Sequence, residues 1–271
     1  MIDPLTSLLH RQAGRHGPVM LMYHSVQPGA AKPDWPWAIS MRRFREQLDL
    51  LAAGGWTTTT MAELAAKPDR WPERTLVITF DDGYADNLAA CEELHSRGMR
   101  ATWFIVSGSI GRAPGWEADR RPHGRMLDAG ELREMHAAGM EIGSHGVGHV
   151  RLTEVSDDRL LEELALSKTT LEALLGEGID SFAYPYGAWD ARCESAVRRA
   201  GYRYACTTRT GLALKDAHPL RMRRLAVFNH DDAGSLARKL SLTTNDGGWN
   251  NVFHYLRARA VARVSGNMTK K

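Results

Sequence analysis

Short apolar segments alternate with helical segments along most of this chain, and this alternation limits the possible folds more than any other feature. Apolar runs typical of strands buried on both faces occur at residues 19–24, 75–80, 101–107, 140–143, 180–184, 202–207 and 220–228. Helical periodicity is found at residues 85–97, 129–138, 156–175, 189–200, 232–240 and 250–264, and an earlier helix ends at Gly54. Such an alternation favours a parallel sheet whose strands are joined by right-handed crossovers.

The length of 271 residues suits one large domain or two small ones. We find no break in composition and no internal repeat, and we count seven or eight candidate strands. The sequence therefore predicts one α/β domain of the barrel type over residues 1–271. In such barrels the reactive groups lie at the C-terminal ends of the strands.

The composition is that of an ordinary globular protein, with 43% hydrophobic and 25% charged residues. A net charge of only +3 does not call for a nucleic-acid partner, and we expect none. Three widely spaced cysteines, Cys91, Cys193 and Cys206, form no CxxC pair, so reduced structural thiols are expected. Neither a secretory pattern nor a run of the roughly 18 apolar residues that a membrane span needs is apparent, and we expect a cytoplasmic location.

Two adjacent carboxylates follow the predicted strand 75–80, in the stretch Thr79-Phe80-Asp81-Asp82-Gly83-Tyr84. Neighbouring carboxylates repel each other, and an unpaired buried carboxylate is costly. A surface turn with side-chain hydrogen bonds would tolerate them. A bound metal ion would do so as well, because its charge lowers the pKa of nearby acids.

Polar groups also end three other predicted strands. His24 ends strand 19–24, the stretch Ser144–His149 (SHGVGH) follows strand 140–143, and Tyr184-Pro185-Tyr186-Gly187 stands at the end of strand 180–184. Each group alone has an ordinary explanation, as a buried histidine, a pair of solvated loop histidines or a turn. Strand ends on one face of a barrel converge, however. One Asp and two His then form a three-ligand site with open positions, and the other Asp and His24 remain as a base and an acid.

These stretches, in this order and spacing, resemble the first three motifs of the polysaccharide deacetylase family, the NodB-like carbohydrate esterases. The resemblance extends over residues 18–225, which we take as the motif-bearing barrel core, with residues 249–271 as a C-terminal helix and tail. It implies a single distorted (β/α) barrel of about seven parallel strands. It also implies removal of acyl groups from sugars, usually acetyl from N-acetylglucosamine, with the help of a divalent metal.

The roles of single residues follow from the resemblance, position by position. Asp82, His145 and His149 match the metal ligands, and Asp81 matches the general base. Zinc suits this ligand set best, although Co²⁺, Ni²⁺ and Fe²⁺ also accept such donors. The backbone N–H of Tyr186 matches a donor to the oxyanion.

The opening Leu21-Met22-Tyr23-His24-Ser25-Val26 resembles the branch that contains poly-N-acetylglucosamine deacetylases. In that branch the motif with the general acid comes before the Asp-Asp motif, which assigns the acid to His24. The usual late Leu-x-His motif is matched poorly by Asn229-His230.

One position departs from the family pattern. Many members carry an arginine two residues before the proline of the third motif, where it orients the base, but this chain has Ala183. We predict that Arg224 replaces it. We also predict that Tyr184 and Trp37 contact the substrate.

Several alternatives remain open at this point. The site would also serve a deformylase or another deacylase on a lipid-linked amino sugar, and the fold would also serve a non-catalytic carbohydrate-binding module. The substrate is expected to be a glycan or glycolipid of a surface-polysaccharide pathway. The last helix carries apolar residues beside Arg257, Arg259 and Arg263. It either lies on an anionic membrane or packs against the barrel with its arginines in solvent.

Overall fold

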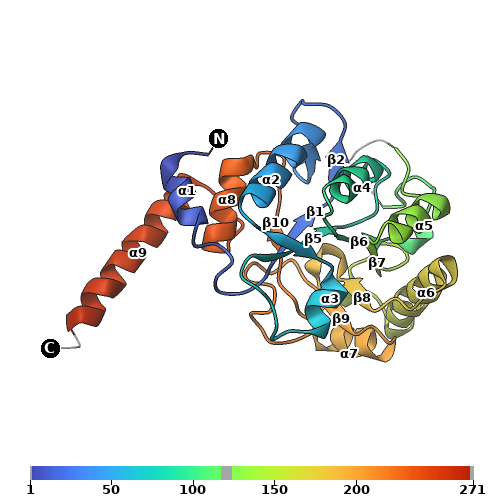
Figure 1. The fold of residues 1–271 in the computed structure, drawn as a ribbon. Helices are drawn as coiled ribbons and strands as arrows, with labels where there is room; N and C mark the ends of the chain where they lie inside the picture. Colours follow the sequence, from blue (N-terminus) through green and yellow to red (C-terminus); the bar gives the residue numbers. More distant parts are fainter. Residues whose placement is uncertain (1, 117–123, 269–271) are drawn as a thin grey trace.

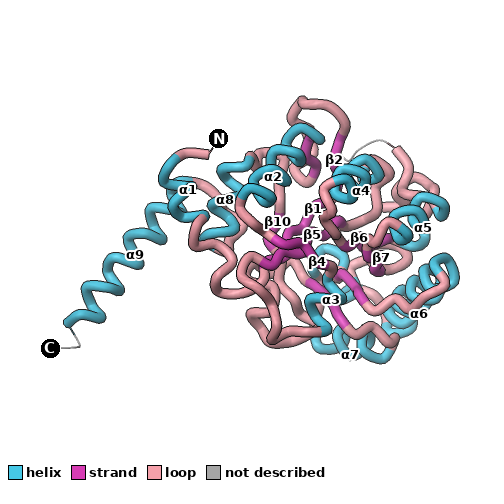
Figure 2. Tube along the Cα trace, in the orientation of Figure 1, coloured by secondary structure: helices cyan, strands magenta, loops and turns pink. Residues whose placement is uncertain are grey.

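The structure is a computed structural model that describes residues 2–116 and 124–268. Its centre is a curled sheet of parallel strands in the order β10-β1-β5-β6-β7-β8-β9, with β4 paired to the beginning of β5 (Figures 1 and 2). These strands are β1 (Val19–Tyr23), β4 (Thr57–Thr59), β5 (Thr75–Phe80), β6 (Thr102–Ile105), β7 (Glu141–Ser144), β8 (Ser181–Ala183), β9 (Tyr204–Cys206) and β10 (Leu225–Ala226). The seven strands of the main path curl into an incomplete barrel, which confirms the predicted fold class.

Helices cover the outside of this sheet, as Figure 1 shows. The helices of the described residues are α1 (Pro4–His10), α2 (Met41–Ala53), α3 (Met61–Ala66), α4 (Asn87–Ser96), α5 (Ala129–Ala137), α6 (Asp157–Leu175), α7 (Ala191–Arg199), α8 (Ala233–Leu242) and α9 (Trp249–Met268), the last of which does not cover the sheet. Short 3₁₀ turns are η1 (Ser107–Ser109), η2 (Leu152–Glu154) and η3 (Pro185–Gly187), and a second small sheet pairs β2 (Ser25–Gln27) with β3 (Ala38–Ser40).

The core has two parts because neighbouring residues of a strand point to opposite faces. Leu21 and Ile78 belong to the large cluster between the strands and the outer helices. Met20 and Val77, one residue away in each strand, belong to a smaller cluster inside the barrel. Strands β1 and β5 are buried along their whole length. A rigid, doubly covered sheet of this kind gives its strand ends well-fixed positions.

The last helix does not pack along the barrel. In Figure 1, α9 extends away from the body of the molecule, and it contacts α8 near its beginning. Val252 is buried there, whereas 58% of Phe253 is exposed. Packing along the barrel, one of the two alternatives left open by the sequence, is therefore not found for the part whose side chains are described, which ends at residue 258; the side chains of Arg259 and Arg263 lie outside it. No helix in the described ranges is both long and apolar enough to cross a bilayer.

Candidate active site

The four predicted groups do converge, because they follow strands that lie side by side. Strands β1, β5, β6, β7 and β8 are consecutive neighbours in the sheet. His24 follows β1, Asp81 and Asp82 follow β5, His145 follows β7, and η3 follows β8. The candidate site thus lies at the C-terminal edge of the parallel sheet, where barrel enzymes carry their reactive groups.

Asp82, His145 and His149 form a buried cluster. The Nε2 atoms of His145 and His149 lie 3.5 and 3.3 Å from Oδ1 of Asp82. One ligand atom from each of the three side chains lies within 4.8 Å of the others. All three residues are buried. This compact set of one carboxylate and two imidazoles matches the donor set of a three-ligand metal centre.

The protonation of His145 gives independent support for a cation at this point. Its Nδ1–H donates a hydrogen bond to the carbonyl of Ala183 at 2.8 Å, so its Nε2 carries a lone pair toward Asp82. Burial lowers the pKa of His145 to about 4, which keeps the ring neutral near pH 7. Oδ1 of Asp82 is buried and forms no hydrogen bond in the described part of the chain. Two acceptors that face each other in a buried site fit a bound cation between them.

The charge of Asp82 is also compatible with this role. Burial alone would raise the pKa of this carboxyl group, but the facing imidazoles of His149, His24 and His145 outweigh burial. The pKa is therefore held below its ordinary value, and Asp82 is ionised near neutral pH.

The backbone bends sharply to aim these ligands. Asp82 and His149 have positive φ values of 75° and 53°, a region that costs a non-glycine residue about 1–3 kcal/mol. Gly83 follows with φ 90°, and a Cβ there would lie 2.9 Å from Cδ1 of Ile105. The glycine of the Asp-Asp-Gly stretch is thus required by both its conformation and its surroundings.

Asp81 has a different partner from its neighbour. Arg224 donates two hydrogen bonds to the Asp81 carboxylate, at 2.6 Å from Nη1 to Oδ1 and 2.8 Å from Nη2 to Oδ2. The guanidinium is fully buried and also donates to the carbonyl of Thr207 and the hydroxyl of Thr79. Burial raises the pKa of Asp81, but the charge of Arg224 outweighs it and keeps this pKa low. The structure therefore places Arg224 where the sequence predicted it, against the candidate base.

His24 lies beside the two carboxylates. Burial lowers its pKa, while the charges of Asp82 and Asp81 oppose that shift. Its ring is 4.8 Å from the ring of Trp37 and 5.8 Å from that of Trp35, between ring centroids. Its Nδ1 is buried and has no hydrogen-bond partner among the described residues. An imidazole with a free nitrogen next to the cluster is available for proton transfer.

His230, the rival candidate for the acid, faces solvent instead. Its side chain is 63% exposed, and its Nε2 lies 4.0 Å from a carboxylate oxygen of Asp231. Its ring stacks on Phe228, which in turn contacts Trp37. The geometry favours His24 over His230 as the acid.

The stretch Tyr184–Gly187, which follows β8, lies at the edge of the site. Tyr186 has φ 59° within η3, and its ring lies 4.5 Å from that of His149. Tyr186 is 41% exposed, and Arg151 stacks on it at 4.4 Å. Tyr184, by contrast, is completely buried and packs edge-on against Phe182. The predicted contact between Tyr184 and the substrate is therefore wrong, because this side chain belongs to the core.

Two aromatic residues near the site were missed by sequence reasoning. Trp116 lies 4.6 Å from the ring of His149, on the loop after η1, and Trp35 contacts His24. Trp35 lies in a loop that is rich in Pro, Gly and Trp, and Trp116 lies in a stretch, about 111–125, that is rich in Pro, Gly and Arg; neither tryptophan is among the predicted site residues. The tryptophans of these loops are the sequence signal that could have placed them near the site, although Trp35 is only 7% exposed and belongs to a buried aromatic cluster.

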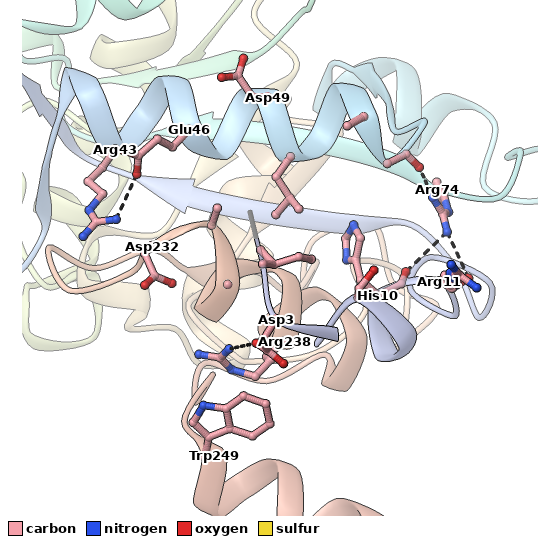
Figure 3. A pocket seen from close by; sticks show the side chains of 17 residues that line it. Asp3, His10, Arg11, Arg43, Glu46, Asp49, Arg74, Asp232, Arg238 and Trp249 are labelled. Carbon is pink, nitrogen blue, oxygen red and sulfur yellow. Dashed lines mark hydrogen bonds and ion pairs between the residues drawn. The ribbon is translucent and has the colours of Figure 1, made fainter. Parts of the chain in front are cut away.

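A separate cavity of about 1080 Å³ lies away from this cluster, between α1, α2 and α8 (Figure 3). Some of its charged lining residues pair with one another, as Arg43 does with Glu46 and Asp3 with Arg238. None of the predicted site residues lines it. We therefore assign the chemistry to the strand ends and not to this cavity.

A curled parallel α/β barrel with a buried Asp-His-His cluster and an Asp–Arg pair at its strand ends defines the class of protein: a barrel hydrolase. Comparisons with known proteins identify the family. The family model "Polysaccharide deacetylase" matches residues 69–205, about half of the chain. The chain belongs to the polysaccharide deacetylase family, and it is a hydrolase that acts on the amide bond of N-acetylated sugars.

Relatives and solved structures agree with this assignment. YxkH of Bacillus subtilis, whose name assigns it to the polysaccharide deacetylases, is 29% identical over 212 residues, 77% of this chain and 70% of its own. The structure of IcaB from Ammonifex degensii is 27% identical with a TM-score of 0.65, covering 78% of this chain and 91% of IcaB. Streptococcus pyogenes deacetylase PplD shares the fold, with 21% identity, a TM-score of 0.71 and coverage of 82% and 97%.

Proposed function

We propose that this protein removes the N-acetyl group from an amino sugar of a surface glycan or glycolipid, with a divalent metal held by Asp82, His145 and His149. The observation that carries this proposal is the buried Oδ1 of Asp82, which faces two imidazole nitrogens without a hydrogen bond. Zinc suits one carboxylate and two imidazoles best, and Co²⁺, Ni²⁺ or Fe²⁺ would also be accepted. When bound, such an ion supplies Lewis-acid polarisation of the acyl oxygen and lowers the pKa of water.

The other residues divide the proton transfers between them. Asp81, kept ionised by Arg224, accepts a proton from the attacking water. The backbone N–H of Tyr186 donates to the developing oxyanion, a contact worth about 2.7–4 kcal/mol in similar sites. His24 donates a proton to the leaving nitrogen; burial lowers the pKa of its ring, and the charges of Asp82 and Asp81 offset part of that shift. Acetate and a free amine result.

The metal assignment is tested by elemental analysis after equal loading of wild type and His145→Ala. We expect about one equivalent of metal in wild type and a strong loss in the variant, because one of three ligands is removed. An exposed histidine provides the matched control, His95→Ala, which should load as wild type does. Equal metal in wild type and His145→Ala would refute the assignment.

The identity of the acyl group that the enzyme removes is tested by identifying the acid that is released. We expect acetate from N-acetylated glucosamine oligomers or glycolipids, and loss of that activity after chelation, with recovery on adding Zn²⁺ or Co²⁺. Release of formate from an N-formyl sugar, with no acetate from any N-acetyl sugar, would assign the protein to the deformylases instead. Activity that survives complete metal removal would refute metal dependence.

We further propose that the enzyme works in the cytoplasm beside a membrane. The three cysteines are buried and unpaired, which suits a reducing compartment. The sequence from Gly247 to the end carries five basic residues and no acidic one. Phe253 and Trp249 are exposed on α9 beside the exposed Arg257. An aromatic and basic surface of this kind suits anionic lipid headgroups, and it would hold the enzyme near a lipid-linked substrate.

A further inference from the structure

A buried carboxylate from outside the motifs holds the loop between the two candidate histidine ligands. Glu163, on α6, is completely buried. Its Oε2 accepts hydrogen bonds from the backbone N–H groups of Val147 and Gly148, at 2.7 and 2.9 Å. Val147 and Gly148 lie between His145 and His149 in the chain. Successive N–H groups that point at one anion form a backbone nest, here occupied by a side chain of the same protein.

The charge of Glu163 is balanced by one partner only among the described residues. Arg159, one helical turn earlier on α6, donates to Oε1 of Glu163 and is 40% exposed. A buried carboxylate without this cation would be costly. The arginine also donates to Glu162, which is exposed. The Glu163 side chain therefore meets the loop with one oxygen and Arg159 with the other, while the arginine remains partly exposed at the surface.

The loop is shaped to receive this carboxylate. A Cβ on Gly146 would lie 2.9 Å from Oε2 of Glu163, and one on Gly148 would lie 3.1 Å from Oε1. Gly146 also has a positive φ of 81°. The two glycines of the His-Gly-Val-Gly-His stretch thus leave room for Glu163, a constraint that the spacing of the histidines alone does not explain.

The opposite side of the loop is fixed as well. The carbonyls of Gly146 and Val147 accept hydrogen bonds from the N–H groups of Ser107 and Gly108, at 3.0 and 3.1 Å. The loop is therefore clamped between η1 and Glu163. His149, the residue after the clamp, has a left-handed backbone conformation, which persists only when its surroundings enforce it.

We propose that Glu163, charge-balanced by Arg159, is a positioning residue that sets the distance and orientation of His149 relative to His145 and Asp82. The proposal deepens the function proposed above and depends on its metal site. Glu163 touches neither the ligand atoms nor the substrate. It acts through two backbone N–H groups. Its removal should therefore change the metal affinity and the ligand geometry of the site, and not only the stability of the fold.

The test compares Co²⁺ binding to metal-free wild type, Glu163→Gln and Glu162→Gln, by titration and by the visible absorption of the bound ion. The glutamine at 163 keeps the size of the side chain but places a weaker acceptor at the loop and an amide against Arg159. We expect the dissociation constant for Co²⁺ to rise about 10–100-fold, as is typical when a group that supports metal ligands is lost. The Co²⁺ spectrum should change shape, because it reports the ligand geometry. Glu162→Gln, the exposed neighbour, should match wild type.

Each of three outcomes would overturn the inference. If Glu163→Gln binds Co²⁺ with the affinity and spectrum of wild type while only its melting temperature falls, Glu163 has a purely structural role and the metal site still stands. If wild type itself binds no metal, the metal site is refuted and the inference with it. Should Glu163→Gln fail to fold, Arg159→Gln supplies the same measurement from the surface side, and an unchanged dissociation constant there would equally refute the charge-balanced clamp.

Discussion

Asp81 and Asp82 are adjacent in the chain, yet their carboxylates meet opposite partners. Asp81 turns to the guanidinium of Arg224, and Asp82 turns to two imidazoles. The left-handed backbone at Asp82 separates the two side chains. Each carboxylate is thereby stabilised in its charged form by its own surroundings. The repulsion between the two adjacent carboxylates therefore does not force either of them to take up a proton. This separation suits the proposed division of roles, with Asp82 as a metal ligand and Asp81 as the base.

Asp81→Asn should abolish turnover while the metal content stays at the wild-type level. The amide cannot accept the proton of the attacking water, and the three ligand side chains are untouched. A general base contributes at least about 10²-fold to the rate, so a loss of this size in kcat is expected. Steady-state kinetics of metal-replete protein measure it, with the exposed Asp69→Asn as a control. Normal turnover in Asp81→Asn would assign the base elsewhere.

His24→Ala should lose most activity on N-acetyl sugars but much less on an activated aryl acetate. An amine leaves a tetrahedral intermediate only when it is protonated, whereas a phenolate leaves without help. Misfolding would damage both reactions alike, so the ratio of the two rates identifies the acid. His230→Ala should behave as wild type, because its ring faces solvent. The opposite pattern would move the acid to His230.

At the scale of elements, the sequence predicts strands and helices best where a whole strand, or one face of a helix, is buried. The strands β1, β5, β6 and β7 and the helices α4 to α8 occur close to the predicted ranges, because long apolar or amphipathic runs leave few alternatives. The structure adds α1, α3, β2, β3 and β4, which are short; β4 consists of three threonines without an apolar pattern. Strand 220–228 is reduced to Leu225–Ala226.

The grouping of the site residues was also predictable from the sequence. Residues at the ends of neighbouring parallel strands must converge, so Asp82, His145 and His24 could be grouped from the order of elements alone. Glu163 could not be found in this way. It acts from the middle of a helix through backbone atoms, and nothing in its type or spacing separates it from the exposed Glu162 beside it. The burial of Tyr184 was likewise a property of packing and not of its motif.

The helix α9 carries a prediction of its own. The protein should sediment with vesicles that contain anionic phosphatidylglycerol and not with neutral phosphatidylcholine vesicles. Phe253→Glu should weaken this binding several-fold, because it replaces an exposed aromatic contact by a charge that the anionic surface repels. Leu166→Glu, at an exposed leucine on α6, is the matched control and should bind as wild type does. Equal vesicle binding by all three proteins, or none by wild type, would refute the membrane contact.

At the scale of the whole molecule, one buried acid links stability to pH. Burial raises the pKa of Asp86 to about 6, against a partial offset from the hydroxyl of Ser25, which donates to it. Its other oxygen is buried without a hydrogen-bond partner among the described residues. The folded pKa thus lies above the unfolded value of 3.8. The contribution of Asp86 to stability is present below about pH 4 and is lost as the pH rises through 6.

Asp86→Asn, which mimics the protonated form, should therefore remove this pH dependence. Near pH 4 the two proteins should have similar free energies of unfolding. Above pH 6 the variant should be more stable, by up to about 3 kcal/mol for a pKa shift of this size. Urea unfolding at pH 4, 5, 6, 7 and 8 measures the difference. A difference that does not change with pH, or that favours wild type at pH 8, would show that Asp86 is not held protonated by the fold.

The pairing of Asp81 with Arg224 also has a consequence for how the enzyme matures during synthesis. The two residues are 143 positions apart in the chain. Arg224 also lies beyond residue 205, where the match to the family model ends. A nascent chain that has exposed only the earlier motifs holds its candidate base without a cation, in a pocket that would favour the protonated acid. The candidate base therefore gains its buried cation only when the segment before β10 has closed onto the sheet, so the pairing couples completion of the fold to completion of the site.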